Sequence, residues 1–178
     1  SLLLSLYFQV ILGLPPAVSG AILLVQPIIM AFLSPRAGDL SDKYGPRGIA
    51  SIGLVLTALG LTAFALFPRV PVSGAAIFLV FIGLGAALFG APNNSAIMGS
   101  VKKMHHGIAS SLLALSRNLG QPLSIAVVTF IMTTETAKQP SYTGGVLAAL
   151  HASFVILAVL CFLAVAASLA RGHHQKKA

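Results

Sequence analysis

The sequence of 178 residues has very few charged side chains, and most of those are of one sign. Charged residues make up 8% of the chain, only three residues are acidic, and the formal net charge is +8. A soluble domain carries about a quarter charged residues, so this chain cannot cover a water-exposed surface of the usual kind. Hydrophobic residues instead make up 57% of the sequence. The composition predicts an integral membrane protein whose main partner is the lipid bilayer.

Other residues are scarce too, and their scarcity excludes several classes of site. The single cysteine, Cys161, lies in an apolar run, which excludes a disulfide framework and a cysteine metal centre. No Ser/His/Asp, Cys/His or phosphate-loop arrangement is present, so the chain is not expected to be an enzyme, and we assign it no cofactor and no metal. Lys and Arg occur in short segments between apolar runs, not on one basic face, which argues against a nucleic-acid partner.

Apolar runs divide the chain into five full membrane spans and one partial span. A helix that crosses a bilayer needs roughly 20 residues, and each of the full runs has about 19–28. The first run is shorter, and we expect it to be the second half of a helix that begins outside this sequence. Residues 1–178 are thus predicted to form a single all-α transmembrane domain, a six-helix bundle with a truncated first helix. Its expected spans are 1–14 (partial), 17–35 with a kink at Pro27, 48–67, 73–100, 107–133 and 144–170, followed by a basic cytoplasmic tail at 171–178.

Assigning the loops alternately to the two sides of the membrane gives a strong asymmetry of Lys and Arg. One side holds eight of these cations, and the other holds only Arg69 and Lys138. Cytoplasmic loops are enriched in Lys and Arg, so the side with eight, and with it the C-terminus, is predicted to be cytoplasmic. The eight are Arg36, Lys43, Arg47, Lys102, Lys103, Arg171, Lys176 and Lys177.

Small residues recur at helical spacing on two of the spans. They favour close approach of helix backbones, which in lipid is driven by packing. Two interpretations are open: general bundle packing, or helices that slide against their neighbours. The residues are Gly53, Thr57 and Gly60 on one span, and Gly83, Ala87, Gly90 and Asn94 on the next.

A short charged segment, Gly38 to Arg47, separates two apolar runs and contains both aspartates of the chain. If the preceding helix continues into it, Gly38 and Asp42 share a face, and Asp42 points at a neighbour that Gly38 allows to approach. Asp42 could then dock on a helix N-terminus, where carboxylates are stabilised. A solvated basic loop is the alternative.

This segment resembles the loop signature of the major facilitator superfamily, G-x-L-x-D-[KR]-x-G-x-[KR]. The whole chain is similar to the carboxyl half of the fourteen-helix drug:proton antiporters of the EmrB/QacA type, through stretches that include Tyr7–Gln9, Gly13–Pro16, Gly83–Gly85, Ala91–Met98, Gly107–Ser110 and Ser116–Gly120. The resemblance implies one half of a two-half transporter that works by alternating access. It also implies that the signature is a conformational latch, with Lys43 in place of the more common arginine. The latch residues would be Gly38, Leu40, Asp42, Lys43, Gly45 and Arg47.

Arg117 is the only formal charge inside an expected span. It lies ten residues past Gly107, which is about 15 Å along a helix and near the middle of the hydrocarbon. Ionisable residues at that depth usually face the bundle interior or an aqueous cavity, although a long side chain can also snorkel outward. Ser110, Gln121 and Ser124 share its face, so we predict a polar stripe toward a cavity or toward the other half of the transporter.

A proline-kinked, amide-rich segment lies on the fourth span at Pro92, Asn93 and Asn94. Such segments are typical of bending transporter helices, because proline frees a backbone carbonyl. We therefore predict that these three residues line the same cavity as Arg117.

No carboxylate lies at membrane depth, since Asp39 and Asp42 are at one edge and Glu135 is at the other. A proton-driven exporter needs such a group, so the proton site is expected in a missing amino-terminal half. The leading hypothesis is the carboxyl half of a proton-coupled exporter of small amphipathic organic compounds in a bacterial inner membrane. The alternatives are a six-helix subunit with a structural or regulatory partner role and a nonfunctional fragment. The coding sequence upstream of Ser1 would distinguish them.

Overall fold

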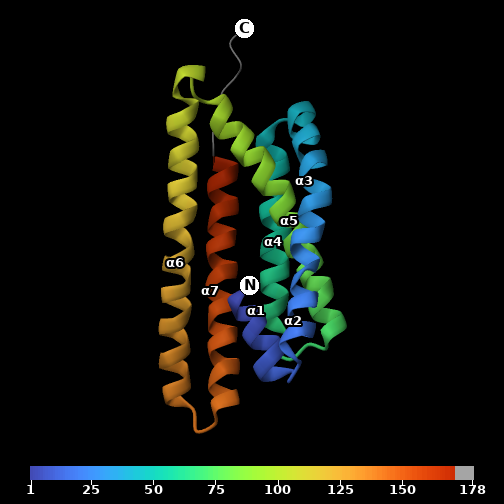
Figure 1. Cartoon of the computed structure of the whole chain (residues 1–178), viewed down its shortest axis with the longest axis vertical. Coiled ribbons are helices and arrows are strands. Elements are labelled where there is room, and N and C mark those ends of the chain that lie inside the picture. Colours follow the sequence, from blue (N-terminus) through green and yellow to red (C-terminus); the bar gives the residue numbers. More distant parts are fainter. Residues whose placement is uncertain (171–178) are drawn as a thin grey trace.

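The structure, a computed structural model, describes residues 1–170, and this part of the chain is helical with no strand. The predicted all-α class is confirmed. The helices run roughly along one long axis as a bundle (Figure 1). Their bounds are α1 Leu2–Leu6, the π-helix η1 Tyr7–Ile11, α2 Pro16–Leu23, α3 Val25–Tyr44, α4 Pro46–Leu66, α5 Val72–Gly99, the 3-10 helix η2 Lys103–His105, α6 His106–Lys138 and α7 Tyr142–Ala170. The predicted tail, 171–178, lies outside the described residues.

Helices α2 and α3 form one rod with an interruption at Leu24. Proline has no N–H and its ring clashes with the preceding turn, so Pro27 is tolerated in the first turn of α3 but not in the interior of one unbroken helix. The irregularity accordingly falls three residues before Pro27, where we predicted a kink. Backbone hydrogen bonds still cross it, since the N–H of Ile28 donates to the carbonyl of Leu24 at 3.0 Å.

Helix α3 extends well beyond Pro35, where the sequence suggested the end of the span. An interior proline costs about 3 kcal/mol, but the continuation packs a face of Ala37 and Ser41, which are 1% and 2% exposed. The helix therefore continues through Pro35 with this face packed, and it ends only at Tyr44. The segment predicted as a charged hinge is therefore mostly helical.

Four rods in the described part of the chain are long and apolar enough to cross a membrane: Pro16–Tyr44, Pro46–Leu66, Val72–Gly99 and Tyr142–Leu169. Helix α6 is not among them, although its 33 residues would reach about 50 Å. Its polar side chains lower its average hydropathy. It also packs mainly on α7 and lies at one edge of the bundle (Figure 1), and no residue on it is buried.

An aromatic core ties the first helical segment to the rest of the bundle. The Tyr7 ring meets Phe64 edge to face with ring centroids 6.3 Å apart, and Phe64 stacks on Phe154 of α7 at 5.0 Å. The Tyr7 hydroxyl donates to the carbonyl of Val70 at 2.7 Å and accepts the N–H of Val70 at 2.6 Å. This pair satisfies two backbone groups in the α4–α5 turn, so the turn is held firmly against the first segment.

Close backbone contact joins α4 and α5. A Cβ added at Gly53 would lie 2.7 Å from the carbonyl oxygen of Gly85, and one added at Gly60 would lie 2.6 Å from a side-chain carbon of Ile82. Neither glycine could therefore bear a side chain without a shift of the helices. The small-residue stripe on α4 thus packs directly against α5.

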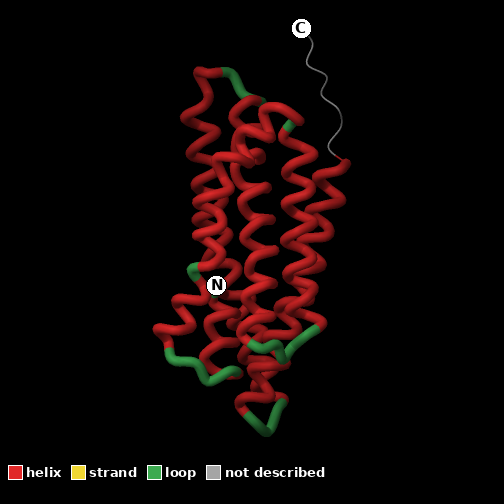
Figure 2. The backbone as a smooth tube through the Cα atoms, turned by 90° about the vertical axis from the view of Figure 1, so that its right-hand side faces the viewer, coloured by secondary structure: helices red, strands yellow, loops and turns green. Residues whose placement is uncertain are grey.

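The turns between helices gather at the two ends of the bundle, as Figure 2 shows. The α3–α4 corner and the α5–α6 turn lie at the same end, and Figure 1 shows α7 finishing toward that end. The α4–α5 turn with Arg69 and the α6–α7 turn near Lys138 lie at the other end. The signature segment and the Lys102–Lys103 turn thus lie at one end, and Arg69 and Lys138 lie at the other, whereas the basic tail of the charge count lies outside the described residues.

Candidate functional site

The signature segment forms a tight corner between α3 and α4. Gly38, Leu40, Asp42 and Lys43 lie on the last two turns of α3, and Arg47 is the second residue of α4. Gly45 connects the two helices with a φ of +89°, a backbone conformation open to glycine and strained for residues with a side chain. The glycine therefore sets the direction in which α4 leaves the corner.

Asp42 is exposed at this corner and has no hydrogen bond or ion pair to any described residue. It lies in the last turn of α3, where the partial negative charge of the helix end disfavours a carboxylate. Neighbouring Lys43 is favoured there for the same reason. Gly38 shares the face of Asp42, and a Cβ built at Gly38 would meet nothing within 4 Å. The carboxylate thus faces open space beside a smooth helix surface.

A second group of polar residues lies between α5 and α6. The Arg117 guanidinium donates through Nη2 to the side-chain oxygen of Asn94 at 3.0 Å. Closer to the end of the bundle, two turns before Arg117 on α6 and one turn after Asn94 on α5, the Ser110 hydroxyl contacts the sulfur of Met98 at 3.8 Å. These two contacts hold the first half of α6 against the last turns of α5.

The kinked segment of α5 places Asn94 for this contact. Pro92 lies inside α5 and is fully buried, while Asn93 and Asn94 are half-buried. Proline cannot donate to the carbonyl four residues earlier, which loosens the helix at that point. Of the two amides, Asn94 turns its oxygen to Arg117, and Asn93 has no hydrogen bond to a described residue.

The polar stripe on α6 is fully exposed in this chain. Ser110 and Ser124 each donate to a carbonyl one turn back on their own helix, to His106 at 2.8 Å and Gly120 at 2.7 Å. Gln121 is exposed and has no hydrogen bond to a described residue. Arg117 and Gln121 are therefore the residues of the stripe whose side-chain donors remain available.

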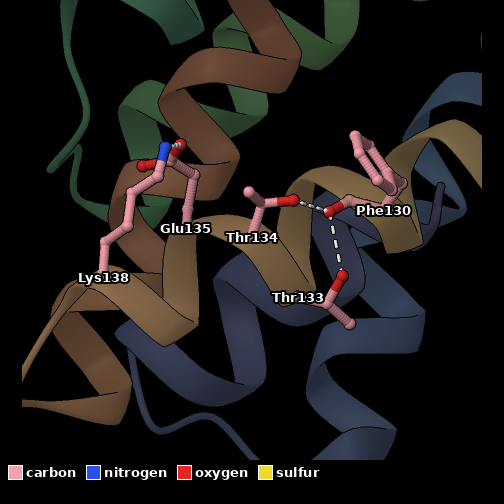
Figure 3. A network of polar contacts seen from close by, with 5 residues as sticks. All are labelled: Phe130, Thr133, Thr134, Glu135 and Lys138. Atoms are coloured by element: carbon pink, nitrogen blue, oxygen red, sulfur yellow. Dashed lines mark hydrogen bonds and ion pairs between the residues drawn. The ribbon is translucent and has the colours of Figure 1, made fainter.

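Glu135, the third acidic residue, is far from this group, near the opposite end of α6. Its carboxylate accepts from Lys138 at 2.6 Å in an exposed pair one turn apart. Figure 3 shows this pair beside Thr133 and Thr134, whose hydroxyls both donate to the carbonyl of Phe130. Arg117 therefore has no acidic partner among the described residues.

The structure brings some predicted site residues together and leaves others apart. Arg117 and Asn94 are joined by a hydrogen bond, whereas neither bonds to the α3–α4 corner within the described residues, and the cavity that we expected them to line stays a prediction. A hydrogen bond between the hydroxyls of Ser51 and Ser168 at 2.9 Å, from α4 to α7, was not predicted. Serines at these positions carry no local signal, since their pairing depends on how α4 and α7 cross.

A cavity of about 390 Å³ opens at the end of the bundle opposite the signature corner. Arg69 from the α4–α5 turn and Thr143 from the start of α7 are its polar side chains. It contains none of the predicted site residues. Its remaining lining is Ile11, Leu12, Gly144 and Leu147.

Comparison with known proteins adds the family context. A model of the Major Facilitator Superfamily matches residues 1–178. The chain is 33% identical over 167 residues to the riboflavin transporter RibZ of Clostridioides difficile, covering 92% of this chain and 37% of the relative. It is 29% identical over 130 residues to the multidrug resistance protein Stp of Mycobacterium tuberculosis, covering 71% of this chain and 24% of the relative.

Mycobacterium tuberculosis also has a multidrug resistance protein B homolog. This chain is 25% identical to it over 137 residues, covering 74% of this chain and 25% of the relative. The chain thus spans between about a quarter and just over a third of the length of these relatives.

Proposed function

Because the chain belongs to the Major Facilitator Superfamily, a family of integral membrane transporters, we propose that it forms the carboxyl-terminal half of a proton-coupled exporter of small amphipathic organic compounds. The related proteins named for riboflavin transport and for multidrug resistance support a small organic substrate. We further propose that the complete protein is of the fourteen-helix EmrB/QacA type and resides in a bacterial inner membrane, with its C-terminus in the cytoplasm.

The Arg117–Asn94 pair is the observation that carries this proposal. Arg117 lies within the expected span 107–133, although α6 is less apolar than the four candidate spans. A guanidinium at membrane depth is costly in lipid, so it is expected to face protein or water. Its partner is a neutral amide from another helix, and the rest of its face is polar and exposed in this chain. A second half of the transporter packed along α6 would enclose this face as one wall of a passage.

We propose that the carboxylate needed for proton coupling lies outside the residues described. Both aspartates lie at the α3–α4 corner, and Glu135 pairs with Lys138 at the other end of the bundle. We therefore place the coupling carboxylate in the amino-terminal half. This chain contributes the substrate-facing cation and the moving corner.

The corner acts as the latch of alternating access in this proposal. Asp42 is exposed, lacks a partner among the described residues, and sits where its own helix disfavours it. A helix N-terminus on a neighbouring segment would stabilise it by up to about 1–2 kcal/mol. Docking in one conformation and release in the other would bias the two states.

Transport by the complete protein in proteoliposomes with an imposed proton gradient tests the function. We expect gradient-driven export of an amphipathic dye and loss of export when the gradient is collapsed. Asp42→Asn should reduce the rate at least tenfold while membrane insertion stays unchanged. Asp39→Asn is the matched control, because Asp39 is exposed on the same helix end but is not part of the signature. A rate for Asp42→Asn equal to that of the unaltered protein would exclude the latch.

A further inference from the structure

Around Arg117, hydrogen-bond donors outnumber hydrogen-bond acceptors. Arginine carries five N–H donors and no acceptor. The Nη2 of Arg117 donates to Asn94, so the amide oxygen of Asn94 must be the atom that faces the guanidinium. The Asn94 amide nitrogen, which carries two N–H donors, then points away from Arg117 and stays available.

The neighbouring side chains do not correct this imbalance. Ser110 and Ser124 donate to carbonyls of α6 itself and keep only acceptor lone pairs. Each is seven residues from Arg117, about 10 Å along the helix, so these acceptors lie away from the guanidinium. Gln121 offers one acceptor, but its amide also adds two donors. The group formed by Arg117, Asn94 and Gln121 therefore presents mainly N–H donors.

The uncompensated positive charge of Arg117 also favours a ligand that accepts hydrogen bonds. Arg117 carries a full positive charge, since guanidinium does not lose its proton in proteins. Among the described residues its hydrogen-bond partner is neutral, and the nearest acid along α6, Glu135, already binds Lys138. In a membrane interior of low dielectric constant, an uncompensated charge strongly favours a ligand of opposite sign.

From these observations we propose that Arg117, Asn94 and Gln121 form a substrate subsite that selects amphipathic organic anions. The anion's carboxylate or sulfonate would accept from Arg117 and from the Asn94 amide. Its apolar part would lie along the same face of α6, where half-buried Leu113 and exposed Ala114 are one turn before Arg117. This inference rests on the proposed function and adds the substrate class to it.

Two dyes with the same xanthene ring and opposite charge test the selectivity in the complete transporter. Fluorescein is an anion and rhodamine 123 is a cation, so their ratio of transport rates isolates charge. We expect the unaltered protein to prefer fluorescein and Arg117→Gln to lower the ratio about tenfold or more. Arg117→Lys should keep the preference at a reduced rate, because lysine retains the charge but lacks the planar fork of donors.

Asn94→Asp provides a second variant that keeps the size of the side chain. It would place a carboxylate about where the amide oxygen accepts from Arg117 at 3.0 Å, neutralise the guanidinium and abolish the preference for the anion. Arg69→Gln removes the same charge at an end of the bundle, outside the subsite, and should leave the ratio unchanged.

The possible results distinguish failure of the proposed subsite from failure of the proposed exporter function. Transport of both dyes with a ratio unaffected by Arg117→Gln and Asn94→Asp would overturn the subsite and leave the exporter intact. A ratio in the unaltered protein that favours rhodamine 123 would also overturn the subsite. No gradient-driven transport of either dye would refute the exporter, and the subsite with it.

Discussion

At the scale of single residues, one glycine shapes the fold, and two charged side chains are the candidates for function. Gly45 has a backbone conformation that only glycine adopts without strain, and it fixes the corner between α3 and α4. Asp42 and Arg117 are exposed charged side chains, and neither has a partner of opposite charge among the described residues. The glycine builds the fold, and the charged side chains carry the proposed latch and the proposed subsite.

Gly45→Ala is expected to destabilise the corner. A residue with a Cβ at a φ of +89° is strained by about 1–3 kcal/mol. The melting temperature of the detergent-purified protein should fall by several degrees. Gly38→Ala is the matched control, because Gly38 lies within α3 and an added Cβ there meets nothing within 4 Å. Equal melting temperatures for the two variants would contradict this account of the corner.

Only part of the structure of the signature segment can be predicted from its sequence. Its residues and its position between two spans are readable from the sequence, and so is the conditional prediction that Gly38 and Asp42 share a face on a continued helix. The continuation itself depends on burial of Ala37 and Ser41 against neighbouring helices. Because local propensity at Pro35 opposes a helix, only packing could decide the outcome.

At the scale of elements, the helices differ in how much of their surface is packed against other helices of the bundle. Helices α4 and α5 pack through glycines with backbones in contact, and α7 packs along α4. Helix α6 packs mainly against α7, and it contacts α5 through the Arg117–Asn94 and Ser110–Met98 pairs. Its weak packing and polar stripe suit an element that faces the rest of a transporter.

Gly53→Ala is expected to disrupt the α4–α5 contact. The added Cβ would lie 2.7 Å from the backbone of both Gly85 and Phe89, and overpacking of this kind typically costs about 1–3 kcal/mol. Gly48→Ala on the same helix should have the opposite sign, since its Cβ meets nothing within 4 Å and alanine favours a helix by up to about 1 kcal/mol over glycine. Thermal unfolding in detergent measures both, and a stabilising Gly53→Ala would be inconsistent with the packing described.

At the scale of the whole molecule, charge is separated along the bundle axis. The corner with Lys43 and Arg47 and the turn with Lys102 and Lys103 share one end, whereas Arg69 belongs to the turn at the other (Figure 1). Positive segments are retained in the cytoplasm during insertion. The first end is therefore expected to be cytoplasmic in the complete protein.

Cysteine labelling in intact cells measures this orientation. In a Cys161→Ala background, Ser141→Cys should react with a membrane-impermeant maleimide, because Ser141 is exposed at the end predicted to face outward. Ser100→Cys, exposed at the opposite end, should react only after the cells are opened. Labelling of Ser100→Cys in intact cells would reverse the predicted orientation.

The sequence by itself determined the membrane class, the number of helical segments and the charge asymmetry between the two ends. These properties follow from local composition, since any apolar helix of sufficient length is driven into the bilayer whatever its neighbours are. The tertiary structure decided that α3 runs through Pro35, that Tyr7 secures the α4–α5 turn, and that Asn94 is the residue that meets Arg117. Each of these depends on where two helices cross, and a crossing is set by side chains distant in sequence, which no local pattern contains.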